Sequence, residues 1–283
     1  MPELPEVETV MRGMECALAG EVIQGAQQMR PDLRFPFPDG LESRLKGQTI
    51  KSFQRRAKYI LMILSSGEAF ILHLGMSGRV LIIPDGHGIA PEKHDHLIID
   101  MKNGVRVIYR DPRRFGMVYM TRASDDIAAH PAFVKMGPEP LGNEFSGDIL
   151  YERLKNKKTI IKSALLDQRV VAGLGNIYVC EALYRCGIDP RKPSHQINKP
   201  LCDALVRHIR DILNEAIKSG GSTLKDYRHT DDGLGYFQHQ FAVYDREGLA
   251  CPACDCDMMN KNNGIKRIVQ AGRSTFYCPA KQK

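Results

Sequence analysis

The sequence predicts a multidomain α+β fold, and three observations support this prediction. Short strand patterns recur at intervals of roughly ten residues between residues 22 and 120, separated by Gly, Pro and Asp. Beyond residue 142 the apolar residues recur at the spacing of helices, and the chain ends in a hairpin pattern. A length of 283 residues corresponds to about two domains.

The chain opens with a helix pattern that flanks the strand region. Pro5 suits the first turn of a helix, and Glu6 and Glu8 suit the positive end of its dipole. Gly20 ends the pattern. One apolar stripe consists of Val7, Val10, Met11, Met14 and Leu18.

A series of strands is expected after this helix. The segments are residues 49–53, 59–64, 69–74, 79–83, 97–101, 105–110 and 117–120. Such a series of short, evenly spaced strands is typical of a β-sandwich or a β-barrel. Residues 136–142, which contain two Gly and two Pro, then form a linker.

The region after the linker is predicted to be helical. Helices are expected at residues 148–166, 177–186 and 200–218. Residues 222–235 form a polar loop. A final hairpin joins residues 265–270 to residues 274–278 around Ala271-Gly272-Arg273.

Composition favours a polyanionic partner and excludes a membrane protein. Forty Lys and Arg against 33 Asp and Glu leave a net charge of +7. No apolar run approaches the ~18 residues that a membrane span needs. The acidic, proline-bearing N-terminus is unlike a signal or transit peptide, so a cytoplasmic protein is expected.

The eight cysteines fall into two groups. Cys16, Cys180, Cys186 and Cys202 are scattered through predicted helices, where a thiol usually packs as a small core residue. The other group lies within the last 33 residues and comprises Cys251, Cys254, Cys256 and Cys278. Such crowding indicates a metal site rather than a disulfide framework.

The N-terminus carries candidate chemistry. Removal of Met1 before the small residue Pro2 leaves a secondary amine, and an α-amine has a pKa of about 7.7–8.0. A neutral amine can attack a sugar C1′ and form an iminium ion. Glu3 and Glu6 lie beside it and can move protons. Pro and Glu are also ordinary helix-starting residues, and that structural explanation is the alternative.

The N-terminal segment MPELPEVETV resembles that of the bacterial formamidopyrimidine-DNA glycosylases, which remove oxidised purines from DNA. The resemblance continues, in the same order, through most of the chain. The further motifs are QRRAKY (54–59), HLGMSG (73–78), KHDH (93–96), DPRRFG (111–116), GLGNIY (173–178), GGSTLKD (220–226) and GRSTFYC (272–278).

The resemblance implies three domains. They are an N-terminal β-sandwich with a flanking helix (1–135), a helix–two-turns–helix domain (136–235) and a C-terminal β-hairpin finger (236–283). It also implies that the protein works as a monomer on damaged double-stranded DNA, which lies in the cleft between the domains. The damaged nucleotide is extruded, because C1′ of a stacked base cannot be reached.

The resemblance assigns catalytic roles to five residues. Pro2 is the nucleophile, Glu3 is the acid that helps to open the sugar, and Glu6 is a supporting carboxylate. Lys58 lies near the phosphate of the lesion and assists β-elimination. Arg273 grips phosphate at the finger and promotes δ-elimination.

Seven further residues match DNA-contacting positions of the family. Met76 and Phe115 fill the gap that the extruded base leaves, and Arg113 pairs with the orphaned base. The remaining positions, which contact mainly phosphates, are His73, His94, Lys158 and Asn176. A metal pair formed by His94 and His96 is not expected, because no further ligand pattern completes it.

The predicted function is therefore a bifunctional glycosylase and AP lyase of base-excision repair, acting on 8-oxoguanine and formamidopyrimidines. One alternative is the sister type of enzyme that removes oxidised pyrimidines, although Leu4 and the sequence Val7-Glu8-Thr9 favour the purine branch. Another is a non-catalytic protein that binds bent or damaged DNA.

The finger departs from the family pattern, which has two cysteine pairs. Lys281 stands where the last cysteine is expected and cannot replace a thiolate, and residues 257–264 resemble an insertion. One possibility is a rearranged zinc site of Cys251, Cys254, Cys256 and Cys278. The other is a metal-free finger held by the packing of its hairpin.

Overall fold

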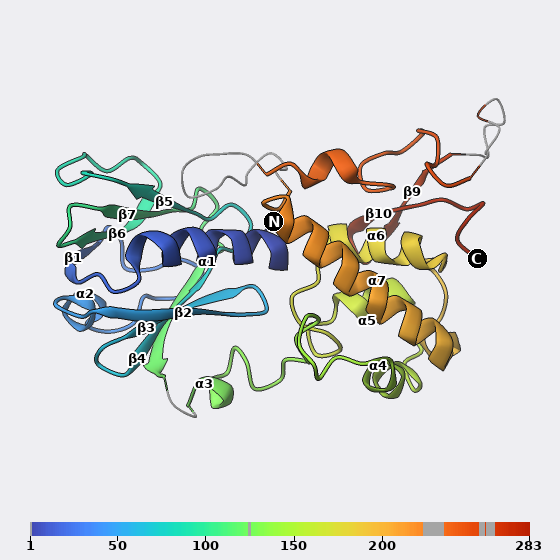
Figure 1. Cartoon of the computed structure of the whole chain (residues 1–283), viewed down its shortest axis with the longest axis horizontal. Helices are drawn as coiled ribbons and strands as arrows, with labels where there is room; N and C mark the ends of the chain where they lie inside the picture. The colour runs from blue at the N-terminus through green and yellow to red at the C-terminus, as the bar shows by residue number, and fades with distance from the viewer. Residues whose placement is uncertain (1, 124–125, 223–234, 255–257, 259–263) are drawn as a thin grey trace. The chain divides into compact units, whose positions relative to one another are not determined.

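The computed structural model describes residues 2–123, 126–222, 235–254, 258 and 264–283 (Figure 1). The chain forms two compact units. The first comprises Met1–Val134 and Ile217–Gln238, and the second comprises Lys135–Ala216 and His239–Lys283. Each unit therefore combines two separate stretches of the chain.

The first unit is a β-sandwich with a helix packed along it. Its helices are α1 (Leu4–Leu18), α2 (Leu41–Leu45) and α3 (Asp126–Ala129). Its strands are β1 (Ile23–Gln28), β2 (Ile50–Arg56), β3 (Tyr59–Leu64), β4 (Glu68–His73), β5 (Arg79–Ile83), β6 (Asp95–Met101), β7 (Arg106–Arg110) and β8 (Met117–Arg122). Figure 1 shows the two antiparallel sheets, with the orders β1-β6-β7-β5 and β2-β3-β4-β8.

Helix α1 buries the apolar stripe that its sequence predicts. Val7 and Val10 are each 1% exposed, and they belong to the same core cluster as Leu72 and Val107 of the two sheets. Full burial of one such side chain stabilises the fold by about 1.5–3 kcal/mol. The sandwich core thus fixes the position of α1 and of the N-terminal residues that precede it.

The strand pattern predicted strands β2 to β8 but missed β1. The sequence IQGAQQ of β1 has no alternation of apolar and polar residues, and only Ile23 of this strand is buried. The strand forms because the edge of β6 offers free backbone groups, with Ala26 opposite Ile99. A period-two pattern cannot reveal a strand that is held mainly by its backbone.

Two connections pass from one sheet to the other and lie side by side. The segment after β4 leads to β5, and the segment after β7 leads back to β8. His73 pairs with Met117 in one sheet, while Arg79 pairs with Arg110 in the other. The HLGMSG and DPRRFG motifs are therefore neighbours in space.

The second unit is mainly helical. Its helices are α4 (Gly147–Leu154), α5 (Ile161–Leu166), α6 (Asn176–Cys186) and α7 (Lys199–Lys218), and its 3₁₀ turns are Ser194–Gln196 and Phe237–Gln240. The last two residues of α7 and the first two residues of the second turn belong to the first unit. The expectation of a single helix over 148–166 is wrong. Thr159 accepts a backbone hydrogen bond from Ser194 (2.9 Å), and Ile160 forms a β-bridge with Pro193. These β-branched residues therefore leave the helix for an extended pairing.

The chain ends in the expected hairpin of β9 (Lys266–Gln270) and β10 (Arg273–Tyr277). Its turn consists of Ala271 and Gly272, which both have positive φ, at 48° and 72°. Arg273 is the first residue of β10 and pairs with Gln270, rather than belonging to the turn as expected.

Among the described residues, no helix combines the length and the apolar character that a bilayer crossing requires. The three-domain division at residues 135 and 235 stays a prediction. The loop predicted at 222–235 lies, except for its two end residues, outside the described residues.

Candidate active site

The N-terminus of the first unit presents a buried acidic pair. Pro2 is buried, and Glu3 and Glu6 are only 2% and 1% exposed. The backbone N–H of Glu3 donates to Glu6 Oε2 at 2.9 Å, so the Glu6 side chain reaches back and caps the first turn of α1. The carboxylates that could transfer protons are thus the same residues that form the start of the predicted helix.

Glu6 also contacts a segment far along the chain. Its Oε1 accepts two hydrogen bonds from Ser222, one from the backbone N–H at 2.8 Å and one from Oγ at 2.9 Å. A Cβ on Gly221 would lie 3.2 Å from the Glu6 carboxylate, and Gly221 has a φ of +77°. A glycine is therefore required where this segment approaches α1.

Lys58 lies in the tight turn between β2 and β3. Arg56 pairs with Tyr59 across the turn, and Ala57 between them has a φ of 53°, a strained value for a residue with a Cβ. Arg55 donates to the Ala57 carbonyl at 3.0 Å and to Glu8 Oε2 of α1 at 2.8 Å. This bridge joins the turn that carries Lys58 to the helix that carries Glu3 and Glu6.

His73 lies opposite this turn as the strand partner of Tyr59, and their ring centroids are 4.6 Å apart. Burial, together with the smaller effect of the positive charges of Lys58 and Arg34, lowers the pKa of His73 to about 4. The N–H of Gly75 donates to Nδ1 at 3.0 Å. The ring is therefore neutral near pH 7, and its proton is on Nε2.

Met76, Arg113 and Phe115 lie on the two neighbouring connections between the sheets. Met76 is half-buried, whereas Arg113 and Phe115 are exposed, with 42% of Phe115 accessible. The Arg113 guanidinium lies 5.0 Å from the centroid of the Phe115 ring. An exposed arginine stacked on an exposed aromatic ring can enter a stacked nucleic acid.

Arg273 is exposed at the start of β10, and its neighbour Ser274 is held by two groups of the second unit. The carbonyl of Ser274 accepts hydrogen bonds from Asn176 Nδ2 at 2.8 Å and from Lys162 Nζ at 3.1 Å. Lys162 is fully buried and also donates to Thr275 Oγ1 at 2.6 Å. The hairpin that carries Arg273 is thus fixed to α5 and α6.

Lys158 and His94 lie in loops. Lys158 is exposed in the extended break between α4 and α5, where its ammonium is accessible to phosphate. His94 is half-buried before β6, and its carbonyl accepts the N–H of Asp111 at 3.0 Å. His96 Nε2 lies 2.8 Å from the Asp111 carbonyl.

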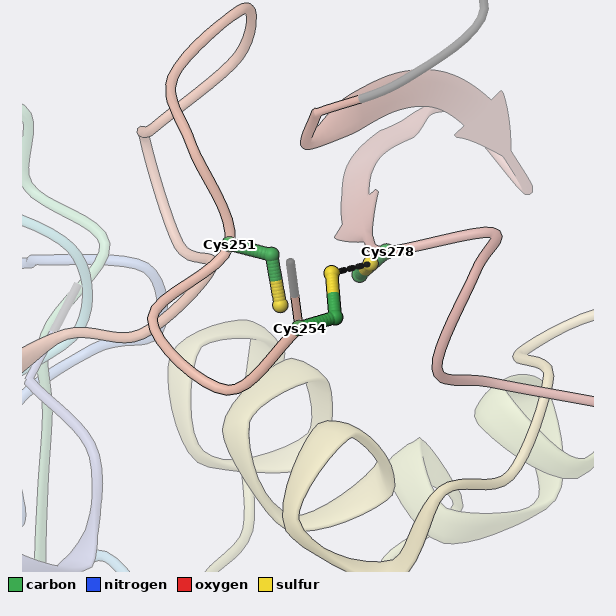
Figure 2. Close-up of side chains that lie close together, drawn as sticks. All are labelled: Cys251, Cys254 and Cys278. Atoms are coloured by element: carbon green, nitrogen blue, oxygen red, sulfur yellow. Dashed lines mark hydrogen bonds between the residues drawn. The ribbon is translucent and has the colours of Figure 1, made fainter. Parts of the chain in front are cut away.

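Three of the four clustered cysteines converge, as Figure 2 shows. Cys251 and Cys254 lie on one loop and Cys278 follows β10, with the three sulfur atoms within 4.8 Å of one another. The Cys254 and Cys278 sulfurs are 3.6 Å apart, close to the ~3.8 Å edge that a tetrahedral zinc site with 2.3 Å bonds requires. The three side chains fit three corners of such a site. Cys256 lies outside the described residues.

The surroundings of the cluster bear on its chemistry. Burial raises the pKa of Cys251, but hydrogen bonds from Tyr184 and from the backbone more than offset this effect, so the pKa lies below its ordinary value. Cys254 takes part in a disulfide bond, and only its reduced form can bind a metal. Lys281 does not replace a ligand; its Nζ lies 4.1 Å from the centroid of the Tyr184 ring.

Sequence reasoning missed the residues that hold these groups in place. They are Arg55, Ser222, Asp111 and Lys162. Arg55 and Asp111 belong to motifs noted in the sequence, but a motif does not show which of its members are buried. Lys162 gives a usable signal, since it stands inside an apolar helix pattern where a lysine needs a buried partner.

The predicted residues divide between the two units. The first unit holds Pro2, Glu3, Glu6, Lys58, His73, Met76, His94, Arg113 and Phe115, and the second holds Lys158, Asn176, Arg273 and the described cysteines. Within the first unit, hydrogen bonds link α1 to the turn of Lys58. Within the second, they link Asn176 to the hairpin of Arg273.

Family profiles and individual relatives both match this chain to the same protein family. The profile of the formamidopyrimidine-DNA glycosylase N-terminal domain matches residues 1–118, and that of the H2TH domain of the same glycosylase matches residues 136–228. Formamidopyrimidine-DNA glycosylases of Ruegeria pomeroyi and Rhodospirillum rubrum are 52% and 49% identical, and the likeness covers 100% of each chain.

Solved structures extend the likeness to the fold. The MutM (Fpg) protein of Thermus thermophilus superposes with a TM-score of 0.86 at 35% identity, covering 99% of this chain and 98% of that one. A Lactococcus lactis Fpg mutant in complex with DNA that contains Fapy-dG gives a TM-score of 0.89 at 34% identity, with both chains fully covered. The expected sandwich, helix–two-turns–helix domain and hairpin finger are confirmed.

Proposed function

The chain belongs to the formamidopyrimidine-DNA glycosylase family and is a base-excision repair enzyme that acts on damaged DNA; from this premise we propose that Pro2 carries out the removal of oxidised purines. The observation that carries the proposal is the buried pair Glu3 and Glu6 at the start of α1, directly after a buried Pro2.

The first step forms a covalent intermediate. Once Met1 is removed, the lone pair of the Pro2 nitrogen attacks C1′, and the bond from C1′ to the base breaks with its electron pair going to the base. The base takes up the proton that the Pro2 nitrogen loses. Glu3 protonates the sugar ring oxygen, so that the ring opens and an iminium ion remains. Glu6 accepts the Glu3 N–H, which holds the backbone of Glu3 in place for this transfer.

Two eliminations then break the strand. Loss of a C2′ proton to solvent breaks the bond from C3′ to oxygen, and the 3′ phosphate leaves with the electron pair. Loss of a C4′ proton to solvent then breaks the bond from C5′ to oxygen and expels the 5′ phosphate. Lys58 stabilises the negative charge at the first of these groups and Arg273 at the second, as cations do beside leaving phosphates. Hydrolysis of the remaining iminium ion restores Pro2.

Substrate recognition divides into backbone and base contacts. His73 donates from Nε2, and Lys158, His94 and Asn176 provide further phosphate contacts. Met76 and Phe115 fill the space that the extruded nucleotide leaves, while Arg113 pairs with the base opposite.

The cysteine cluster is a structural zinc site. Thiolates favour zinc, and Cys251, Cys254 and Cys278 supply three ligands once Cys254 is reduced. We assign the fourth position to Cys256, the remaining cysteine of the group in the last 33 residues. Bound zinc would hold the loop of Cys251 to the hairpin that carries Arg273.

Borohydride trapping tests the covalent step. With a duplex carrying 8-oxoguanine opposite cytosine, we expect the protein to form a trapped complex that migrates as a covalent adduct. Pro2→Gly should reduce trapping by at least about tenfold, since a primary amine replaces a preorganised secondary one. A chain that retains Met1 should trap nothing, because its Pro2 nitrogen is an amide.

Mass spectrometry of the sample establishes first that Met1 has been removed. Cys16→Ser, at an exposed position of α1, is the control and should trap like the parent protein. Tight binding of the damaged duplex without any trapping would reject the covalent mechanism and favour a passive DNA-binding protein.

A further inference from the structure

The two connections that carry Met76 and Arg113 are docked directly against each other. A Cβ on Gly75 would lie 2.4 Å from the carbonyl carbon of Phe115, and Gly75 has a φ of +65°. A Cβ on Gly116 would lie 1.7 Å from the Tyr109 hydroxyl. The backbone of Phe115 and the side chain of Tyr109 therefore leave no space for a side chain at Gly75 and Gly116, respectively.

A single buried carboxylate joins the two connections. Asp111 is 0% exposed, and its oxygens accept three hydrogen bonds. Oδ1 accepts the Ser77 hydroxyl at 2.6 Å, while Oδ2 accepts the Gly116 N–H at 2.8 Å and the Tyr109 hydroxyl at 3.2 Å. These donors come from both connections and from β7. Without them, burial of a carboxylate would be strongly unfavourable.

Ser77 extends this network to the residue proposed to read the opposite base. The backbone N–H of Arg113 donates to Ser77 Oγ at 3.1 Å, and the same hydroxyl donates to Asp111. The chain of hydrogen bonds therefore passes from Arg113, through the connection that carries Met76, to Asp111.

The backbone of Asp111 is held as well. Its carbonyl lies 2.8 Å from Nε2 of the buried His96, and its N–H donates to the carbonyl of His94 at 3.0 Å. Burial lowers the pKa of His96, so the ring is neutral near pH 7, and its one N–H is on Nε2, which faces the Asp111 carbonyl. Burial raises the pKa of Tyr109, so its hydroxyl stays protonated and can donate. Residues of β6 and β7, and His94 directly before β6, therefore hold Asp111 in place.

We propose that Asp111 is a positioning residue that holds the connections of Met76 and of Arg113 and Phe115 as one rigid platform for insertion into the duplex. It touches no DNA itself and acts through the residues that do. The inference rests on the proposed DNA-inserting role of Met76, Arg113 and Phe115. A rigid platform matters because a misplacement of about 1 Å at a reacting site can cost on the order of a hundredfold in rate.

The test follows unstacking of the duplex in stopped-flow fluorescence. The full-length protein is mixed with DNA carrying 8-oxoguanine opposite cytosine and 2-aminopurine beside that cytosine. Asp111→Asn replaces one acceptor by a donor, and Ser77→Ala removes the relay. We expect each to slow unstacking about tenfold, while affinity for undamaged duplex changes less than about twofold.

Two reference variants make the outcomes distinct. Asp100→Asn breaks a pairing with Arg106 (2.7 and 2.9 Å) in the same sheet, away from the connections, and should leave the unstacking rate unchanged. Phe115→Ala removes an inserting side chain and should slow unstacking.

Normal unstacking in folded Ser77→Ala and Asp111→Asn, with slow unstacking in Phe115→Ala, overturns the role of Asp111 and leaves the proposed function intact. Equal slowing in Asp100→Asn also overturns it, since general destabilisation would then explain the effect. No change in Phe115→Ala removes the inserting role and the inference with it. If Asp111→Asn does not fold, Ser77→Ala decides alone.

Discussion

The imidazole of His73 is fixed in one protonation state by its surroundings. Burial and the nearby ammonium of Lys58 hold its pKa at about 4, and the Gly75 N–H occupies Nδ1. The side chain can therefore offer one N–H donor, from Nε2, without carrying a charge. In its proposed phosphate-binding role, a neutral donor beside Lys58 adds no second buried cation to the site.

This protonation state has a measurable cost at low pH. In the unfolded chain the His73 ring takes up a proton near pH 6.5, whereas the folded chain takes it up only near pH 4. The unfolded state thus binds more protons between these values, and stability falls as the pH is lowered. We expect His73→Gln to reduce the loss of unfolding free energy between pH 7 and pH 5 by about 1–2 kcal/mol.

Urea unfolding at the two pH values measures the effect. The control is His195→Gln, which changes an exposed histidine of the second unit and should retain the pH dependence of the parent protein. An identical pH dependence in His73→Gln would show that folding does not lower the pKa of His73.

Sequence analysis proposes residues that face DNA more readily than it finds the residues that hold them in place. Pro2, Lys58 and Arg273 carry recognisable chemistry in motifs of the family. Arg55 acts by donating hydrogen bonds to both Ala57 and Glu8, and Glu8 lies 47 positions away in the sequence. Such a contact depends on how the chain packs and not on the residue type. Chemistry is visible in residue type, whereas positioning requires the fold.

At the scale of elements, the break between α4 and α5 shows where helical periodicity is insufficient. Residues 148–166 keep enough apolar residues for one helix, yet Thr159 and Ile161 make backbone hydrogen bonds with Ser194 and Lys192 instead. The extended segment exposes Lys158 on a loop. A competing partner 30 or more residues away cannot be read from a local pattern.

Removing the basic side chains of Lys158 and Arg113, which lie on different segments, should affect DNA binding in different ways. Lys158→Ala should weaken binding to all duplexes and flatten the slope of log affinity against log salt by about one unit. Arg113→Ala should instead impair excision and the choice of opposite base, because its proposed contact is to a base.

Fluorescence anisotropy over a salt series, together with single-turnover excision opposite each base, separates the two effects. Lys155→Ala, an exposed lysine paired with Glu152, is the matched control for loss of one positive charge. Indistinguishable behaviour of the Lys158 and Arg113 variants in both assays would remove the distinction between phosphate and base contacts.

The finger is an element with two possible means of support. Its hairpin packs in a core cluster with Tyr184 and Val243, and Gln282 bonds the backbone of Cys278 and of Ile188. The cysteine cluster adds a metal site if Cys254 is reduced. The sequence predicted the cluster from crowding, but it could not show that Lys281 packs on Tyr184.

Metal analysis of the reduced protein tests this site. We expect about one zinc ion per chain, as a structural site of four thiolates requires. Cys278→Ser should release the metal and weaken DNA binding, while Cys202→Ser, which changes a buried cysteine of α7, should retain it. Metal-free protein with full excision activity would show that hairpin packing alone supports the finger.

At the scale of the whole molecule, the first unit is discontinuous in sequence. Residues 217–238 belong to it although 82 residues of the second unit, Lys135–Ala216, come between. The contact of Glu6 with Ser222 spans 216 positions and is the most explicit link between the two stretches. Local patterns predicted the order of the elements. They could not predict that the Glu6 carboxylate caps its own helix and also accepts a hydrogen bond from Ser222, because no pattern near Glu6 indicates a partner so far along the chain.

A double-mutant cycle measures this link. Glu6→Gln leaves one acceptor oxygen where the carboxylate has two, so one of its donors, Glu3 N–H or the Ser222 groups, faces an amide N–H. We expect Glu6→Gln to lower the free energy of unfolding by about 1–3 kcal/mol. Ser222→Ala removes the hydroxyl at 2.9 Å, and the two changes should couple by about 0.5–3 kcal/mol.

Urea unfolding of the four proteins gives the coupling energy. Ser43→Ala, whose hydroxyl donates to Gly40 within its own turn, supplies the matched uncoupled pair with Glu6→Gln. Additive effects of Glu6→Gln and Ser222→Ala would mean that the Glu6 carboxylate and the Ser222 hydroxyl do not stabilise each other. Coupling confined to the Ser222 pair would show that the start of α1, directly after Pro2, is stabilised by a segment that follows the first stretch of the second unit, Lys135–Ala216.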